Sequence, residues 1–281
     1  MEFVLIAVAV IAGLLGALLG IGGGTIIVPI MVMLGFPIHE AVGTSLIAVV
    51  ATSIGGALVY LKAGMTNLQL AMILEVTTTL GAICGSYLAF VVDEKFIAIL
   101  FFLVAIFTVY SMIRREVVKR PVMLATSGDT GSAEEVDLQN GSMAFRTYHY
   151  WDELEQQWVT YTPRRIPIGL FAGYIAGILS GLLGIGGGPV KVPVLNLMMG
   201  VPTKVAVATS NYMVGITASA SAFIYLNNGF VRPGVATLVT LGVLLGAQLG
   251  ARISKRLSVP LLRWIFSVVI LLLAGSLIFR A

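Results

Sequence analysis

The stretch Gly20-Ile21-Gly22-Gly23-Gly24 returns 164 residues later as Gly184-Ile185-Gly186-Gly187-Gly188. Each copy interrupts an apolar run, and a proline follows at the same spacing, Pro29 after the first copy and Pro193 after the second. Each glycine destabilises a helix by about 1 kcal/mol relative to alanine. In lipid, the backbone groups that such a break leaves unpaired cost more still, unless protein, water or a ligand satisfies them. We therefore predict two broken helices whose ends face a shared binding site.

The composition is that of a protein with several membrane-spanning segments. Of the 281 residues, 58% are hydrophobic and 11% are charged, and the mean hydropathy is +1.00. Soluble domains carry about 25% charged residues. The net charge of +4 therefore bears on orientation in the membrane, and no basic-aromatic pattern suggests nucleic-acid binding. The apolar N-terminus has Glu2 where a cleaved signal peptide carries a basic residue, so we expect it to be retained.

Metal and cofactor chemistry finds little support in the sequence. Cys84 is the only cysteine, which excludes an internal disulfide and argues against a cysteine-rich metal site. His39 and His149 lack the spacing of metal ligands, and we expect the first in a loop and the second in a strand. No Gly-Lys-Ser/Thr sequence makes the glycine motif a nucleotide loop. We therefore expect no metal and no cofactor.

The second half of the chain repeats the first well beyond the glycine motif. The offset is 164 residues and becomes 165 after one extra residue near Met199. In chain order the matches are Val28-Pro29 with Val192-Pro193, Phe36-Pro37 with Val201-Pro202, Thr44-Ser45 with Thr209-Ser210, Tyr60 with Tyr225, Gly64 with Gly229, Leu80-Gly81-Ala82 with Leu245-Gly246-Ala247, and Gly85 with Gly250. Such an ordered series indicates an internal duplication.

Each half holds one broken segment and three plainer apolar stretches. The broken segments are residues 3–35 and 166–200, and the plain stretches are 41–61, 68–92, 96–113, 206–226, 234–251 and 260–279. Roughly 18 to 25 helical residues cross the ~30 Å hydrocarbon core, and the arms beside each glycine motif are shorter. We predict an all-α membrane protein with a first repeat at 1–113, a linker at 114–165 and a second repeat at 166–281.

Basic residues help to decide whether each broken segment crosses the membrane or turns back. If it crosses, the repeats are parallel and the two sides carry ten and six basic residues. If it turns back, the repeats are inverted and the split is thirteen to three, with Lys95, Arg232 and Arg280 opposite the linker. The positive-inside rule favours the second arrangement. It predicts inverted halves in the cell (inner) membrane, with the linker cytoplasmic.

The linker is the one hydrophilic stretch. Residues Ser127 to Gly141 are rich in glycine, serine and acids, which is typical of a flexible segment. Residues 145–151 and 157–161 alternate around Asp152-Glu153, which predicts a β-hairpin. A lone hairpin is marginally stable, so we expect it to pack on the membrane domain or on a copy of itself, which leaves a homodimer open. A structural cap is favoured over a ligand-sensing role.

Lys191 follows the second glycine motif by three residues, where the first half has Ile27. A lysine at membrane depth is rare and marks a functional pathway or a buried partner. The backbone N–H groups of the two motifs and the start of the following helix at Pro189 add positive potential. We therefore predict an anion site built from Lys191 and the glycines Gly22, Gly23, Gly24, Gly186, Gly187 and Gly188. A lysine that snorkels to the interface is the alternative.

Polar side chains recur near the starts of the helices that follow the broken segments. They are Thr44 and Ser45 in the first half, and Thr209, Ser210 and Asn211 in the second. Singly, each fits a helix cap or an interhelical hydrogen bond, but as a set beside Lys191 they form candidate substrate-binding residues. Asn196 and Gln248 are weaker candidates for the same cavity.

Glu75 is the other charge within an apolar stretch, and its repeat counterpart is Thr240. Three roles remain open for this carboxylate: a salt-bridge partner for Lys191, a proton carrier, or a group at the membrane interface. The stretches Gly81 to Gly85 and Gly246 to Gly250 carry small residues four apart, which predicts close helix packing.

The doubled Gly-x-Gly-Gly-Gly-xxxx-Pro motif, Gly20 to Pro29 and Gly184 to Pro193, resembles that of the TauE/SafE (TSUP) family of sulfite and organosulfonate exporters. So does the run Lys204-Val-Ala-Val-Ala-Thr-Ser-Asn211. The resemblance covers the whole membrane region, whereas the linker hairpin looks like a subgroup insertion. It implies export of small sulfur-containing or carboxylate anions. The first motif lacks the lysine, which rules out a symmetric site with two lysines.

Together these features predict a secondary transporter for a small anion that works by alternating access between inverted repeats. Lys191 would supply positive charge, the paired hydroxyls and Asn211 would bind oxygens, and Glu75 would carry protons. An uncoupled anion channel is the first alternative. An intramembrane enzyme is disfavoured because no Ser–His, Cys–His, paired-carboxylate or His-Glu-x-x-His arrangement lies in the apolar stretches.

Overall fold

The computed structural model describes residues 2–114, 147–152, 156–254, 268, 270–271 and 273–275. The described part is mostly helical, with one two-stranded antiparallel sheet in the linker. This confirms the predicted helical membrane fold with a small β-hairpin. The flexible stretch predicted at Ser127 to Gly141 and most of the last apolar stretch, 260–279, lie outside the described residues.

The helices match the predicted segments closely. The first half contains α1 (Glu2–Leu19), α2 (Gly24–Met33), α3 (Ile38–Lys62), α4 (Leu68–Ala89) and α5 (Glu94–Arg114). The second contains α6 (Ile166–Leu183), α7 (Gly188–Pro193), the π-helix η2 (Val194–Met198), α8 (Thr203–Asn227) and α9 (Pro233–Ser254). Within the described residues, α3, α4, α5, α6 and α9 are long and apolar enough to cross a membrane. The chain is therefore a multi-pass membrane protein.

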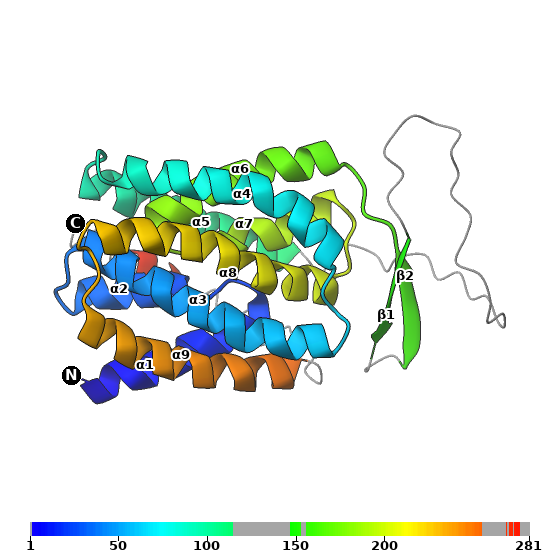
Figure 1. Ribbon diagram of the computed structural model, residues 1–281, viewed down its shortest axis with the longest axis horizontal. Coiled ribbons are helices and arrows are strands. Elements are labelled where there is room, and N and C mark those ends of the chain that lie inside the picture. Colours follow the sequence, from blue (N-terminus) through cyan, green and yellow to red (C-terminus); the bar gives the residue numbers. More distant parts are fainter. Residues whose placement is uncertain are drawn as a thin grey trace.

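Both broken segments turn back on themselves. The backbone N–H of Arg164, just before α6, donates to the carbonyl of Met199, just after η2, at 3.0 Å. The second segment therefore begins and ends at the same end of the molecule. Figure 1 shows the same path for the first segment, in which α2 returns toward the end where α1 begins. Each segment is thus a re-entrant hairpin bent at its glycine motif.

The ends of the helices form two faces. We call the end that carries the strands the hairpin face; it includes the loops at 63–67 and 199–202. The opposite face carries the loops at 34–37, 90–93 and 228–232. Helix α3 runs toward the hairpin face and its repeat counterpart α8 runs away from it, and α4 and α9 are likewise opposed (Figure 1). Equivalent helices therefore run in opposite directions along the molecule.

Helices α4 and α6, and likewise α1 and α9, pack backbone to backbone. A Cβ atom added at Gly81 would overlap the carbonyl oxygen of Tyr174 in α6, and one at Gly85 would overlap that of Ile178. At Gly246 the obstacle would be the carbonyl oxygen of Val10 in α1. The two predicted small-residue stretches thus serve close helix packing, which confirms that prediction.

The β-hairpin packs on the membrane domain. Strand β1 (Tyr148–Asp152) pairs antiparallel with β2 (Gln157–Tyr161). Lys204 Nζ lies 2.5 Å from Asp152 Oδ1, and Asn67 Nδ2 donates to the Tyr161 hydroxyl at 3.0 Å. Burial raises the pKa of Tyr161 to about 12, so its hydroxyl stays neutral at physiological pH. The hairpin therefore ties the α3–α4 loop to the start of α8.

The opposite face has its own polar cluster around His39. This residue lies in the first turn of α3, not in a loop as predicted, because Pro37 already serves as the N-cap of the helix. Its Nδ1 atom is 3.3 Å from Glu94 Oε1, and its Nε2 atom is 2.9 Å from the Ala89 carbonyl oxygen. Arg232 Nε pairs with Glu40 Oε2 at 2.6 Å nearby. His149 lies in β1, as predicted.

Candidate transport site at the glycine turns

The two glycine turns meet backbone to backbone inside the bundle. A Cβ atom at Gly24 would overlap the carbonyl oxygen of Gly184, and one at Gly188 would overlap that of Gly20. Gly22 and Gly186 have φ values of 88° and 73°, a region that side chains disfavour. The motifs are therefore rich in glycine both for the bend itself and because each turn occupies the space where the other would place a side chain.

Each turn is held by a serine from the opposite half. Ser45 Oγ in α3 donates to the carbonyl of Gly184 at 2.9 Å, and Ser210 Oγ in α8 donates to that of Gly20 at 2.9 Å. Two tyrosines make a matching pair of hydrogen bonds close to the C-terminal ends of α1 and α6. The Tyr60 hydroxyl donates to the Ala17 carbonyl, and the Tyr225 hydroxyl donates to the Gly181 carbonyl, both at 3.0 Å. Protein side chains thus satisfy these carbonyls in this conformation.

Valines close the turns on one side. A Cβ atom at Gly22 would lie 2.9 Å from Val214 Cγ1 and 3.0 Å from Val49 Cγ1, and one at Gly186 would meet the same two side chains at 2.6 and 2.7 Å. The structure therefore shows the turns in a closed conformation, in which a ligand would have to displace side chains to reach them.

Lys191 is buried in the middle of the bundle, with 3% of its surface exposed. Its Nζ atom lies 3.4 Å from Glu75 Oε2 in α4 and donates to Thr217 Oγ1 in α8 at 2.5 Å. The Thr217 hydroxyl donates in turn to Glu75 Oε1, and Thr78 Oγ1 donates to Glu75 Oε2 at 2.9 Å. Lys191 does not snorkel to a surface, and of the three roles left open for Glu75 the structure shows the salt bridge.

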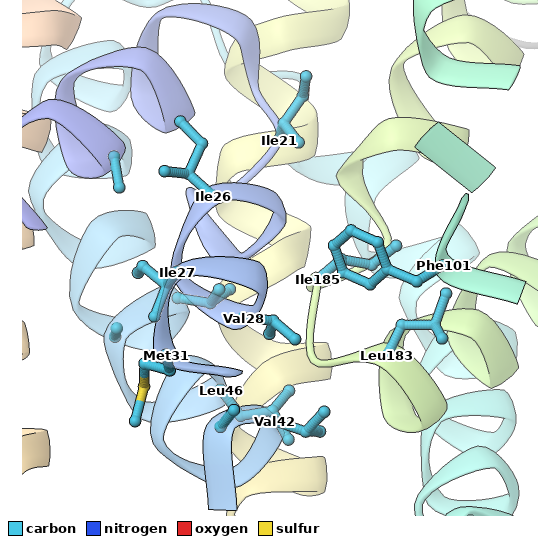
Figure 2. Close-up of a cluster of buried hydrophobic side chains, with 14 of the residues drawn as sticks. Ile21, Ile26, Ile27, Val28, Met31, Val42, Leu46, Phe101, Leu183 and Ile185 are labelled. Atoms are coloured by element: carbon cyan, nitrogen blue, oxygen red, sulfur yellow. The ribbon is translucent and has the colours of Figure 1, made fainter. Parts of the chain in front are cut away.

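The charged cluster exists in one half only. The repeat counterparts of Lys191, Glu75 and Thr217 are Ile27, Thr240 and Thr52. Figure 2 shows Ile27 beside Ile26 and Val28 in an apolar cluster, and all three side chains are buried. The two re-entrant hairpins therefore share a backbone path but present different chemistry, an ammonium in one and an alkyl group in the other.

A small pocket adjoins Lys191 between α4, α6, the second hairpin and α8. It is lined by Leu74 and Thr78 from α4, by Gly173 from α6, by Val194, and by Met213 from α8, among others. Apart from Lys191 and Thr78, these side chains are apolar. In this conformation the pocket has room for about one water molecule, so a larger ligand would have to displace the side chains that line it.

The remaining predicted residues lie at several places around this centre. Thr44 Oγ1 and Asn211 Oδ1 are buried and have no hydrogen-bond partner among the described residues, whereas Asn211 Nδ2 donates to the Ala17 carbonyl at 2.9 Å. Thr209 Oγ1 accepts the backbone N–H of Asn67 at 3.1 Å, near the hairpin face. No hydrogen bond described here joins these groups to Lys191.

Asn196 and Gln248, the weaker candidates, lie away from the charged cluster. Asn196 Nδ2 donates to the Val201 carbonyl at 2.8 Å and so fixes the loop before α8. Gln248 is half-buried in α9 and is not among the residues that line the pocket beside Lys191. The structure thus shows a local role for Asn196 and none at this pocket for Gln248.

Sequence reasoning missed Thr217 and Thr78. Both are fully buried and both hydrogen-bond to Glu75. Hydroxyl residues are common in membrane helices, and nothing in the sequence shows which face of α8 meets α4. The spacing of Thr78, three residues after Glu75, was a signal that could have found it, because residues three apart share a helix face.

Comparisons with known proteins agree on one family. The family model described as "Sulfite exporter TauE/SafE" matches residues 5–277. The "Probable membrane transporter protein YunE" of Bacillus subtilis is 27% identical over 241 residues, which are 83% of this chain and 81% of the relative. A protein of Methanocaldococcus jannaschii that is also described as a probable membrane transporter is 28% identical over 255 residues, 85% of this chain and 81% of the relative.

A plant protein matches a shorter part. "Sulfite exporter TauE/SafE family protein 1" of Arabidopsis thaliana is 42% identical over 67 residues, 24% of this chain and 15% of that protein. No solved structure matches the chain. The family model spans nearly the whole chain, including both re-entrant hairpins and the helices around them. The chain therefore belongs to the TauE/SafE sulfite exporter family.

Proposed function

We propose that the protein is a secondary transporter that exports small sulfur-containing or carboxylate anions, such as sulfite or sulfonates, across the cell membrane. The observation that carries this proposal is Lys191, a buried ammonium group on the second hairpin that contacts Glu75 in α4 and Thr217 in α8. Charged side chains inside membrane proteins are costly and mark the paths of ions and substrates. Relatives that match most of the chain are named as membrane transporters, which supports transport rather than catalysis.

The polar groups around the centre suit an oxyanion. An ammonium group forms charge-assisted hydrogen bonds with sulfite, sulfonate or carboxylate oxygens. The hydroxyls of Ser45 and Ser210 donate to the glycine turns in the closed state and can donate to substrate oxygens when a turn moves. Backbone N–H groups at the start of α2 have no partner within the helix and add further donors. The substrate would thus replace side chains that now seal the centre.

The arrangement of the halves supports alternating access. Equivalent helices run in opposite directions, and each glycine turn is held by a helix of the other half. Transporters built from inverted repeats bind substrate at the repeat interface and expose it to one side at a time. A rocking of one half against the other would open the centre to the hairpin face or to the opposite face, with the linker in the cytoplasm.

Transport by purified protein in liposomes tests the proposal. We expect saturable uptake of radiolabelled sulfite that accelerates when the liposomes are preloaded with unlabelled sulfite. Lys191→Met keeps the length of the side chain but removes its charge, and a lost charge-assisted interaction corresponds to a fall of roughly 10- to 100-fold in rate. Lys62→Met, which changes an exposed lysine at the end of α3, is the matched control and should transport normally.

Two outcomes would count against this account. Flux without acceleration by internal substrate would favour an anion channel built on the same site. No flux above that of empty liposomes for sulfite, methanesulfonate and acetate would overturn the proposed transport altogether.

A further inference from the structure

We propose that an anion binds at Lys191 only together with a proton, which is taken up by Glu75, so that one monoanion and one proton move in each cycle. This inference rests on the proposed function, since it assumes that Lys191 receives the substrate. It names the coupling ion, its carrier and the stoichiometry. The observation behind it is that Glu75 already forms a salt bridge with the Lys191 ammonium group, which the substrate would also have to bind.

The first step is a count of charge. Lys191 and Glu75 form a neutral pair whose side chains are only 2% and 6% exposed. A bound monoanion would leave this buried site with a net charge of minus one, and two anions would compete for one ammonium group. Repulsion between like charges is strong where water is excluded. Transfer of a proton from water to the Glu75 carboxylate gives a carboxylic acid, and the site with its anion is neutral again.

The second step is the fate of the protonated carboxyl group. A carboxylic acid needs an acceptor for its proton, and the hydroxyl oxygens of Thr78 and Thr217 both lie within hydrogen-bond distance of Glu75. Thr217 also contacts Lys191 Nζ at 2.5 Å, so it stays in contact with both groups. Glu75 can therefore change its protonation state without being left unpaired in the bundle.

The third step links the proton to movement. Glu75 belongs to α4, whereas Lys191 belongs to the second re-entrant hairpin, so their salt bridge fastens the hairpin to a crossing helix. Protonation of Glu75 removes this attraction at the moment when the anion arrives. The second re-entrant hairpin is then held in place by the contact of Lys191 with the bound anion. It is released when the anion and the proton leave together.

The stoichiometry follows from the asymmetry of the repeats. The counterparts Ile27 and Thr240 cannot carry a proton, so the first hairpin contributes no second site.

The helices around the site hold few other titratable groups. In α4, α6, α7 and α8, the one further charged residue is Lys204, which pairs with Asp152 at the hairpin face. The other titratable groups there are Cys84 and four tyrosines, namely Tyr87, Tyr174, Tyr212 and Tyr225. In the neighbouring α5, Glu94 and Lys95 lie at the opposite face, Tyr110 is exposed, and Arg114 is the last residue.

Calorimetry can count the protons directly. Binding of methanesulfonate, an anion whose own charge is constant near neutral pH, is measured in buffers that differ in ionisation enthalpy. We expect wild-type protein to take up about one proton per anion, because Glu75 is the one carboxylate that the described residues place at the site. Glu75→Gln should bind the anion with no proton uptake and at least as tightly, because the competing carboxylate is gone. Glu40→Gln, which changes a glutamate at the opposite face, should still take up one proton.

Flux measurements give a second readout. One monoanion moving with one proton carries no net charge, so an imposed membrane potential should leave methanesulfonate flux through wild-type protein unchanged. The double variant Lys191→Met with Glu75→Gln removes both buried charges together; it should fold and bind no anion, which guards against a single variant that fails to fold.

The outcomes separate the two proposals. Anion binding by wild-type protein without proton uptake would overturn the coupling but leave the anion site intact. Unchanged proton uptake in Glu75→Gln would show that another group carries the proton. If methanesulfonate does not bind, the same count is made with sulfite after correction for the proton on the free ion. Failure of both anions to bind or move would overturn the proposed function, and this inference with it.

Discussion

The sequence shows that Lys191 and Glu75 are charged residues within apolar stretches, but it does not show that they form a salt bridge. Lys191 and Glu75 lie 116 residues apart, on segments whose relative rotation only the folded bundle fixes. Thr217, which contacts both, is one of many hydroxyl residues in α8 and carries no local signal. The sequence can thus identify which residues are costly to bury, but the network that makes their burial tolerable depends on helix packing.

Gly188 makes the contact between the two glycine turns testable at a single residue. A Cβ atom there would overlap the Gly20 carbonyl oxygen and lie 2.6 Å from Ile21 Cα, both of which are backbone atoms. Gly188→Ala should therefore lower the free energy of unfolding by about 1–3 kcal/mol or more, the usual cost of overpacking. Thermal unfolding of the purified protein would measure this loss.

Gly234→Ala is the control for that substitution. An added Cβ at Gly234 meets nothing within 4 Å, and alanine favours a helix more than glycine does, so the Gly234→Ala variant should be at least as stable as wild-type protein. If Gly188→Ala were as stable as Gly234→Ala, the two turns could not be packed against each other as described.

At the scale of elements, the break in each hairpin was predictable from glycine and proline alone. The direction taken after the break was favoured only by the count of basic residues, because the local sequence fits a crossing helix equally well. The structure also shows where the second repeat accommodates its extra residue near Met199. The segment Val194–Met198 forms a π-helix, a wider turn that absorbs one additional residue, whereas the matching stretch of α2 stays α-helical.

The β-hairpin is predicted to depend on its ion pair with α8. Asp152→Asn should weaken docking, because Asp152 is buried and Lys204 lies 2.5 Å away. A partly exposed pair contributes about 0.2–1 kcal/mol, which corresponds to a rise of up to about fivefold in the population of the undocked hairpin. Cleavage by trypsin at Arg164 and Arg165, both exposed, would report this population.

The matched variant for the hairpin is Glu40→Gln, which weakens the ion pair with Arg232 at the opposite face. It should leave cleavage in the linker unchanged. Equal cleavage rates for Asp152→Asn and wild-type protein would show that the other contacts of the hairpin suffice to hold it.

For the whole molecule, the distribution of basic residues predicts the orientation in the membrane. If both broken segments turn back, thirteen basic residues lie on the side of the linker and three on the other side. The positive-inside rule then places the hairpin face in the cytoplasm. Single cysteines introduced into a Cys84→Ser background in intact cells can test this with a maleimide that does not cross membranes.

Three positions, two on the hairpin face and one on the opposite face, test the orientation in that experiment. Lys62→Cys and Met198→Cys lie toward the hairpin face and should react only after the membrane is permeabilised. Asn227→Cys lies at the opposite face and should react in intact cells. Labelling of Met198→Cys from outside with Lys62→Cys protected would mean that the second broken segment crosses the bilayer.

The reciprocal serine bonds have a consequence for how the protein is made. The ribosome completes the first glycine turn long before α8 exists, and Ser210, which satisfies the Gly20 carbonyl, is still 190 residues away. The Gly20 carbonyl in the N-terminal half therefore lacks this hydrogen bond until the C-terminal half has been synthesised. Each half thus supplies the hydroxyl that satisfies a glycine carbonyl of the other, so neither half made alone could form both bonds.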